Sequence, residues 1–176
     1  MGTAAGGFKA PTDTSELRVA ERLKGNATTD FGAPAIAPKS DMSPVSPADA
    51  KRLASLLKAS WSKFDRAADA ASGVRLRKGP RGGRTLVAIV SHVLEADGAY
   101  LSRLGGKHQK PTKDGGRAEM SVLRKEILDL LASRSHGETP PMGRRTAPLW
   151  TPRYFVRRSV WHALNHAWEI EDRTPA

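Results

Sequence analysis

Apolar residues recur at intervals of three and four along four stretches of this chain, which is the spacing of one buried face of an α-helix. The stretches cover residues 47–73, 84–104, 117–134 and 152–173. None of the four shows the strict alternation that is typical of a half-buried strand. The sequence therefore predicts an all-α fold, a four-helix bundle with its core between the four apolar faces.

One apolar stripe on each predicted helix is expected to face the core. The stripe residues are Leu53, Leu56, Leu57, Trp61, Phe64, Ala68, Leu86, Val90, Val93, Leu101, Leu104, Met120, Leu123, Ile127, Leu130, Leu131, Val156, Val160, Ala163, Ala167 and Ile170. A hydroxyl residue followed by proline opens two of the helices, at Ser46–Pro47 and at Thr151–Pro152. The hydroxyl can cap the first N–H groups and proline suits the first helical position. Gly73 is the expected stop of the first helix.

The first 46 residues lack this periodicity and are predicted to form a flexible or loosely packed extension ahead of a bundle at residues 47–173. Residues 25–46 are rich in Gly, Pro, Ala and Ser and are expected to form a long loop. Residues 16–24 are ambiguous, because Leu17 and Val19 alternate as in a strand while Val19 and Leu23 fit a helix. A short strand and one or two helical turns both stay open there.

The composition limits which groups could bind a metal and which partners the protein could have. The chain has no cysteine, so a metal would have to be bound by His, Asp, Glu or backbone oxygen. The net charge of +11 fits a nucleic-acid partner, an anionic lipid or an anionic small ligand, and equally an arginine-rich composition that serves solubility alone. No apolar run reaches the ~18 residues of a membrane span, and the N-terminus lacks the apolar core of a signal peptide. A cytoplasmic protein that does not enter membranes is expected.

Histidines provide the main candidate site. His162 and His166 are four residues apart, so on a helix they lie on one face, at the border of the core stripe, and can reach one metal ion. We expect His92, from a neighbouring helix, to complete a three-histidine site, with water or substrate at the remaining positions. On spacing alone, a pair of half-buried structural histidines is the commoner explanation. His108 and His136 lie in polar loops and are expected to be solvated.

Acidic residues near these histidines have two interpretations. Glu169 follows His166 by three residues and is a candidate fourth ligand, orienting group or general base. It is equally placed for a salt bridge with Arg173 at the next turn. Glu95 and Asp97, near His92, are interpreted as solvated or helix-paired charges. The tryptophans are interpreted as packing residues.

A basic, glycine-rich connector, residues 74–84, precedes the second predicted helix. Its glycines would let backbone N–H groups approach an anion. Candidates for holding the acid groups of a bound cofactor or ligand are Arg77, Lys78, Arg81 and Arg84 in the connector, and Arg157 and Arg158 on the last helix. The alternative is a flexible basic loop without a ligand.

Two segments carry a family resemblance. SHVLEADGAYLSRLG around His92 and RRSVWHALNHAWEIEDR at residues 157–173 resemble the DinB-like (DinB/YfiT-type) superfamily. Members of that superfamily are four-helix bundles that typically hold a divalent metal with one histidine of the second helix and an H-x-x-x-H pair of the last. The resemblance covers about residues 47–173 and implies His92, His162 and His166 as metal ligands. It also implies a transferase or isomerase that uses a small thiol such as mycothiol or bacillithiol, or a metal-dependent hydrolase.

Three neutral imidazoles would leave Zn, Ni or Fe its positive charge, which makes a bound water or thiol more acidic. The expected function is thus that of a metal-dependent transferase or hydrolase acting on a small-molecule substrate. One rival is a basic non-catalytic bundle that binds nucleic acid or another anionic partner, although no nucleic-acid-binding motif is visible. A second rival is a bundle whose metal is purely structural. A homodimer is compatible with such a bundle, and no sequence feature requires it.

Overall fold

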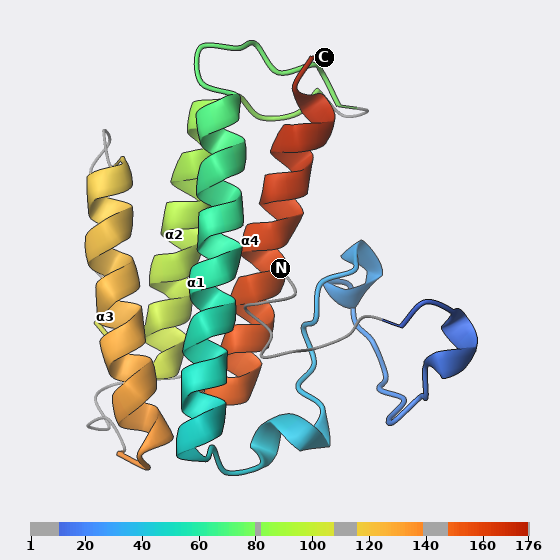
Figure 1. Ribbon diagram of the computed structural model, residues 1–176, viewed down its shortest axis with the longest axis vertical. Helices are drawn as coiled ribbons and strands as arrows, with labels where there is room; N and C mark the ends of the chain where they lie inside the picture. The colour runs from blue at the N-terminus through green and yellow to red at the C-terminus, as the bar shows by residue number, and fades with distance from the viewer. Residues whose placement is uncertain (1–10, 80–81, 108–115, 139–147, 176) are drawn as a thin grey trace.

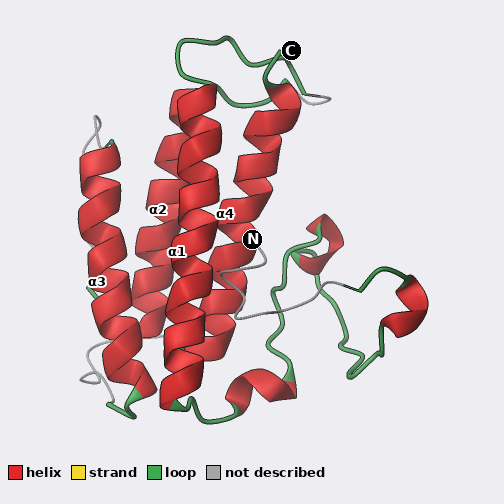
Figure 2. Ribbon diagram, viewed as in Figure 1, coloured by secondary structure: helices red, strands yellow, loops and turns green. Residues whose placement is uncertain are grey.

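The fold was analysed on a computed structural model, which describes residues 11–79, 82–107, 116–138 and 148–175. Its long helices are α1 (Pro47–Ala70), α2 (Leu86–Leu104), α3 (Arg117–Ser135) and α4 (Pro152–Arg173). These four pack side by side as a bundle (Figure 1), and the described residues contain no strand (Figure 2). The predicted all-α four-helix bundle is confirmed. No helix in the described part of the chain is both long and apolar enough to cross a membrane.

The helix starts follow the capping residues. The Ser46 hydroxyl accepts a hydrogen bond from the backbone N–H of Asp49, whose carboxylate accepts one from Ser46 in return. The Thr151 hydroxyl caps α4 by accepting a hydrogen bond from the backbone N–H of Tyr154. The start of α2 lies two residues beyond the predicted one because Thr85 supplies its cap. At the other end of α1 the helix stops three residues before Gly73, which follows in the left-handed conformation.

The bundle has α4 packed between α1 and α2, and α3 on the opposite side against the same two helices. α1 and α4 run in the same direction, since Arg153 in the first turn of α4 pairs with Asp49 in the first turn of α1 at 2.7 Å. α3 runs the opposite way, because Arg117 at its start pairs with Asp69 near the end of α1 at 2.7 Å. The backbone N–H of Trp150, just before α4, bonds the last turn of α2. α2 is therefore antiparallel to α4.

The core agrees with the predicted stripes. Every stripe residue is either buried or packs partly buried against the core. Asp97 differs from its interpretation as a solvated charge, because only 1% of its surface is exposed. It lies four residues after Val93 and four before Leu101, both buried, so the helical period places it on the inner face of α2.

The N-terminal extension lies beside the bundle (Figure 1) and contains three short 3₁₀ helices. They are η1 (Thr14–Glu16), η2 (Thr29–Phe31) and η3 (Lys39–Met42). The predicted strand or helical turns at residues 16–24 are wrong, since residues 17–26 have no regular structure. The apolar side chains that suggested them, Leu17, Val19 and Leu23, are 62%, 69% and 43% exposed, so no packing partner stabilises either conformation.

Besides Ser43 and Pro44, whose carbonyls accept hydrogen bonds from Arg153, η3 is a part of the extension that contacts α4. Its Asp41 is buried and accepts two hydrogen bonds from the Arg157 guanidinium, at 2.7 and 2.8 Å. This bidentate pair fastens the extension to the bundle. Arg157, one of the arginines considered for ligand binding, therefore has a carboxylate partner within the chain.

Candidate metal centre

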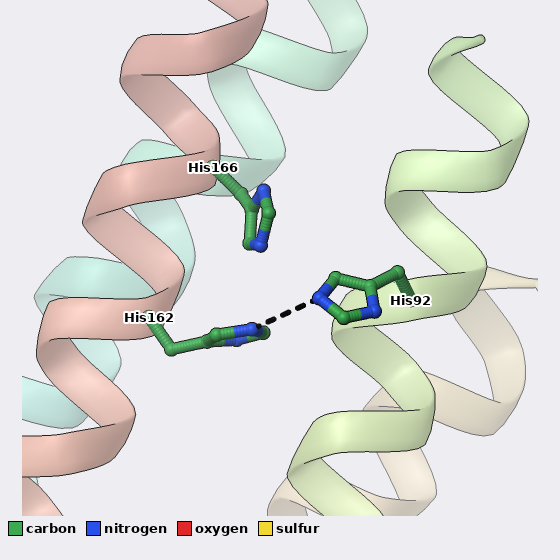
Figure 3. A group of neighbouring side chains, drawn as sticks. All are labelled: His92, His162 and His166. Carbon is green, nitrogen blue, oxygen red and sulfur yellow. Dashed lines mark hydrogen bonds between the residues drawn. The ribbon is translucent and has the colours of Figure 1, made fainter. Parts of the chain in front are cut away.

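Three histidines converge between α2 and α4. His162 and His166 project from successive turns of α4, and His92 reaches toward them from α2 (Figure 3). Each ring offers one nitrogen such that the three nitrogens all lie within 4.8 Å of one another. The ring centroids are 4.6 to 5.2 Å apart. The structure thus brings together the three residues that the sequence selected.

The closest pair of nitrogens has a spacing that suits shared coordination. Nε2 of His92 and Nε2 of His162 are 3.3 Å apart. Two nitrogens that each lie about 2.0–2.1 Å from one tetrahedral zinc are about 3.3–3.4 Å apart. The same separation also fits a weak hydrogen bond between the two rings, with one ring donating a proton to the other. Only small adjustments of the side chains would therefore be needed to hold an ion.

Burial keeps these imidazoles neutral. His162 and His166 are 6% and 5% exposed, more deeply buried than the half-buried border position predicted for them. Desolvation is the largest cause that lowers the pKa of His162, to about 3, with the two neighbouring histidines adding to it. Desolvation is also the largest cause that lowers the pKa of His92 and the pKa of His166. Near neutral pH each ring therefore keeps one nitrogen lone pair free of a proton, as metal ligation requires.

Glu169 supports one of the three rings. Its Oε2 lies 2.7 Å from Nδ1 of His166, and its Oε1 accepts a hydrogen bond from Arg173 at 2.8 Å. The contact of Glu169 with His166 and its salt bridge with Arg173, which the sequence left as alternatives, occur together. With Nδ1 engaged by the carboxylate, His166 presents Nε2 to the other two rings, which is the usual arrangement behind a histidine ligand. Its role as a general base stays a prediction.

Arg173 also fastens the basic connector to the end of α4. Its guanidinium donates to the carbonyl oxygens of Arg77 and Arg84, at 2.9 and 2.6 Å. Arg77 donates in turn to the carbonyl of Asp172 at 2.8 Å. Gly83 has φ +76°, and a Cβ there would come within 2.6 Å of the Arg173 guanidinium. The positive φ favours glycine at this point, and a side chain there would displace the Arg173 guanidinium.

Some of the other predicted anion-binding residues act on the histidines electrostatically, and others are engaged elsewhere or exposed. The Arg77 guanidinium is engaged by carbonyl groups at the end of α4, and Lys78 is exposed. Arg81 lies outside the described residues. Arg84 is exposed, yet its charge contributes to lowering the pKa of all three histidines, which puts it near the site. Arg158 acts on His162 in the same way.

Tyr100 borders the site and was missed in the sequence. Its ring centroid is 5.6 Å from that of His162, and the Arg158 guanidinium lies 5.8 Å above it. The available signal was its position eight residues after His92, about two turns further along α2. That spacing alone does not distinguish a residue beside the site from one that faces another helix.

Comparisons with protein-family models, with curated proteins and with solved structures find no match. The resemblance to the DinB-like superfamily therefore stays a prediction. Of the two loop histidines, His136 is exposed at the end of α3 as expected, and His108 lies outside the described residues. What the described residues define is an all-α bundle with three histidines grouped between two of its helices.

Proposed function

We propose that this protein is a DinB-like metal-dependent enzyme that binds one divalent ion, Zn, Ni or Fe, through His92, His162 and His166. The observation that carries the proposal is the grouping of three imidazole nitrogens within 4.8 Å of one another, contributed by two helices. The neutral state of the buried rings and the carboxylate behind His166 support it. Nitrogen ligands suit these three metals and do not distinguish among them.

Three protein ligands favour a catalytic site over a purely structural one. Structural zinc sites are usually closed by four protein ligands, whereas catalytic sites keep a position for water or substrate. Glu169 is held by His166 and Arg173 and does not belong to the group of three. A bound ion would supply a Lewis acid that makes a coordinated water or thiol more acidic. We therefore propose a transferase or hydrolase that uses a low-molecular-weight thiol or water.

Metal analysis of the purified protein tests the site. We expect about one divalent ion per chain in the wild type, and loss of most of it in His162→Ala and in His166→Ala, because either change leaves only two ligands. His136→Ala is the matched control, since His136 is an exposed histidine at the end of α3. Circular dichroism should show that all three variants keep their helices. Full metal occupancy in both site variants would reject the proposal.

Removal of the ion separates a catalytic from a structural role. If the ion serves catalysis, chelation should abolish transfer of a small thiol to a generic electrophile and leave the melting temperature nearly unchanged. A structural ion contributes its binding free energy to folding, so chelation would lower the melting temperature strongly.

Nucleic-acid binding rests on the net charge of +11 alone and stays a prediction.

A further inference from the structure

Arg158 is a half-buried cation close to His162. Its Nη1 is shielded from solvent and has no hydrogen-bond partner among the described residues. The guanidinium is held between two aromatic rings, 5.8 Å from the ring centroid of Tyr100 and 5.3 Å from that of Trp161. A buried donor left without an acceptor is unfavourable and uncommon in folded proteins. Its position is therefore fixed by the rings, while part of its hydrogen-bonding capacity is unused.

The other arginines of α4 show what this helix normally provides for a guanidinium. Each of the other three pairs with a carboxylate at 2.7 or 2.8 Å: Arg153 with Asp49, Arg157 with Asp41, and Arg173 with Glu169. Arg158 makes no such ion pair within the described part of the chain, although it is held in place as they are. The acceptor that Arg158 lacks is thus a carboxylate, which the protein provides for the other three arginines of α4.

The unused donor lies on the side of α4 that carries the histidines. Arg158 precedes His162 by four residues, so the two side chains occupy successive turns of one face. The Tyr100 ring contacts both of them, 5.6 Å from the His162 ring centroid and 5.8 Å from the guanidinium. His162 and Arg158 are therefore neighbours along α4 that border the same aromatic ring.

We propose that Arg158, positioned by Tyr100 and Trp161, is a substrate-binding residue. Its guanidinium donates hydrogen bonds to the carboxylate of a small acid bound at the three-histidine centre. A carboxylate offers two acceptor oxygens in the plane of the guanidinium fork, which is the partner that this group binds best. A neutral oxygen could also accept a hydrogen bond from Nη1, but that bond would lack the charge assistance that a carboxylate provides. The inference rests on the proposed metal centre and adds the chemical class of its ligand.

Two thiols of equal chain length test this preference. The full-length protein is loaded with Co²⁺, which accepts nitrogen ligands as zinc does and reports thiolate binding by its absorbance. Titration with 3-mercaptopropionate and with 3-mercapto-1-propanol gives an affinity for each. We expect the acid to bind the wild type at least about tenfold more tightly, because its carboxylate can form charge-assisted hydrogen bonds to the Arg158 guanidinium, whereas the alcohol offers one uncharged acceptor.

Arg158→Met keeps an unbranched apolar stem and removes the guanidinium. We expect it to bind cobalt as the wild type does and to lose the preference for the acid. Arg158→Lys keeps the charge without the planar fork and should show an intermediate preference, which provides a second measurement if the Met variant folds poorly. Arg66→Met is the control, since it removes one positive charge at an exposed position of α1.

The outcomes separate this inference from the proposed function. Equal affinity for the two thiols, or no binding of either, in cobalt-loaded wild type would overturn the carboxylate subsite and leave the metal centre standing. An undiminished preference in Arg158→Met would overturn it as well. Failure of the wild type to bind cobalt would overturn the metal centre, and the subsite with it.

Discussion

Asp97 places a carboxyl group in the apolar interior of the bundle. Its Oδ2 is buried and has no hydrogen-bond partner among the described residues. Desolvation raises the pKa of Asp97 to about 7, and the charge of Arg124 offsets only part of this effect. Because water stabilises the ionised carboxylate far better than this interior does, the protonated form is favoured in the folded protein up to neutral pH.

This burial predicts a pH-dependent stability. In the unfolded chain the Asp97 pKa returns to about 3.8, so between that value and about 7 the folded state holds a proton that unfolding releases. The contribution of the neutral carboxyl to stability is fully present below the unfolded pKa and is lost as the pH rises through 7. The pKa difference corresponds to at most about 4 kcal/mol. Asp97→Asn cannot ionise, so its stability relative to wild type should rise from pH 5 to pH 8.

Urea denaturation at pH 5 and pH 8 measures this difference, with wild type and variant in the same metal state. Taking the difference between the two proteins cancels the titration of the histidines. Asp129→Asn is the control, because Asp129 is exposed and pairs with Lys125 on its own helix. Parallel curves of unfolding free energy against pH for Asp97→Asn and wild type would contradict the raised pKa.

Contacts within one helix could be predicted from the sequence, and contacts between helices could not. The pairs His162 with His166 and Glu169 with Arg173 follow from helical spacing alone, because residues four apart always share a face. Tyr100 reaches His162 only because α2 and α4 pack in one particular register. Periodicity says which residues face inward, and it does not say which residue of another helix each of them meets.

At the scale of elements, Arg173 connects the basic connector to the three-histidine site. It donates to two carbonyls of the connector and to Glu169, which in turn holds His166. Arg173→Ala should lower the unfolding free energy by about 1–3 kcal/mol, because three hydrogen bonds of a largely buried guanidinium are lost. It should also weaken metal binding about tenfold, since the carboxylate that orients His166 loses its second partner.

Competition with a metallochromic chelator measures the affinity, and thermal melting measures the stability. Arg66→Ala is the matched control, because this exposed arginine bonds only Ser62 on its own helix. If Arg173→Ala binds the metal as tightly as wild type, Glu169 is positioned without the connector. The role assigned to Arg173 would then be limited to the fold.

The elements themselves were predictable wherever a cap and a long apolar stripe coincided. α1 and α4 begin at the predicted residues because Ser46 and Thr151 cap them. Residues 16–24 had only three apolar side chains and no cap, so their conformation depended on a packing partner that the fold does not provide. A short segment has too little of its own hydrogen bonding to define a helix or a strand without such a partner.

On the scale of the whole molecule, the site depends on how α2 is held against α4. His92 belongs to α2 and the other two histidines to α4, so any change in the register of these helices would separate the ligand nitrogens. Their antiparallel packing is fixed at one end by the connector and at the other by the bond from Trp150 to the last turn of α2. The extension before residue 47 contacts α4 through η3 and through the carbonyls of Ser43 and Pro44, which accept hydrogen bonds from Arg153. These contacts all lie beyond residue 31.

Deletion of residues 1–31 should therefore leave both the bundle and its metal centre intact. Residues 11–32 are exposed except for the partly buried Thr29, so losing them uncovers almost no apolar surface. We expect the unfolding free energy to change by less than about 1 kcal/mol, with unchanged metal content. A longer deletion, of residues 1–43, removes η3 and leaves Arg157 without Asp41, and it should destabilise the bundle measurably. If the shorter deletion already abolished cooperative melting, residues 11–31 would have to stabilise the bundle through contacts other than those described, and the bundle at residues 47–173 would not be an autonomous unit.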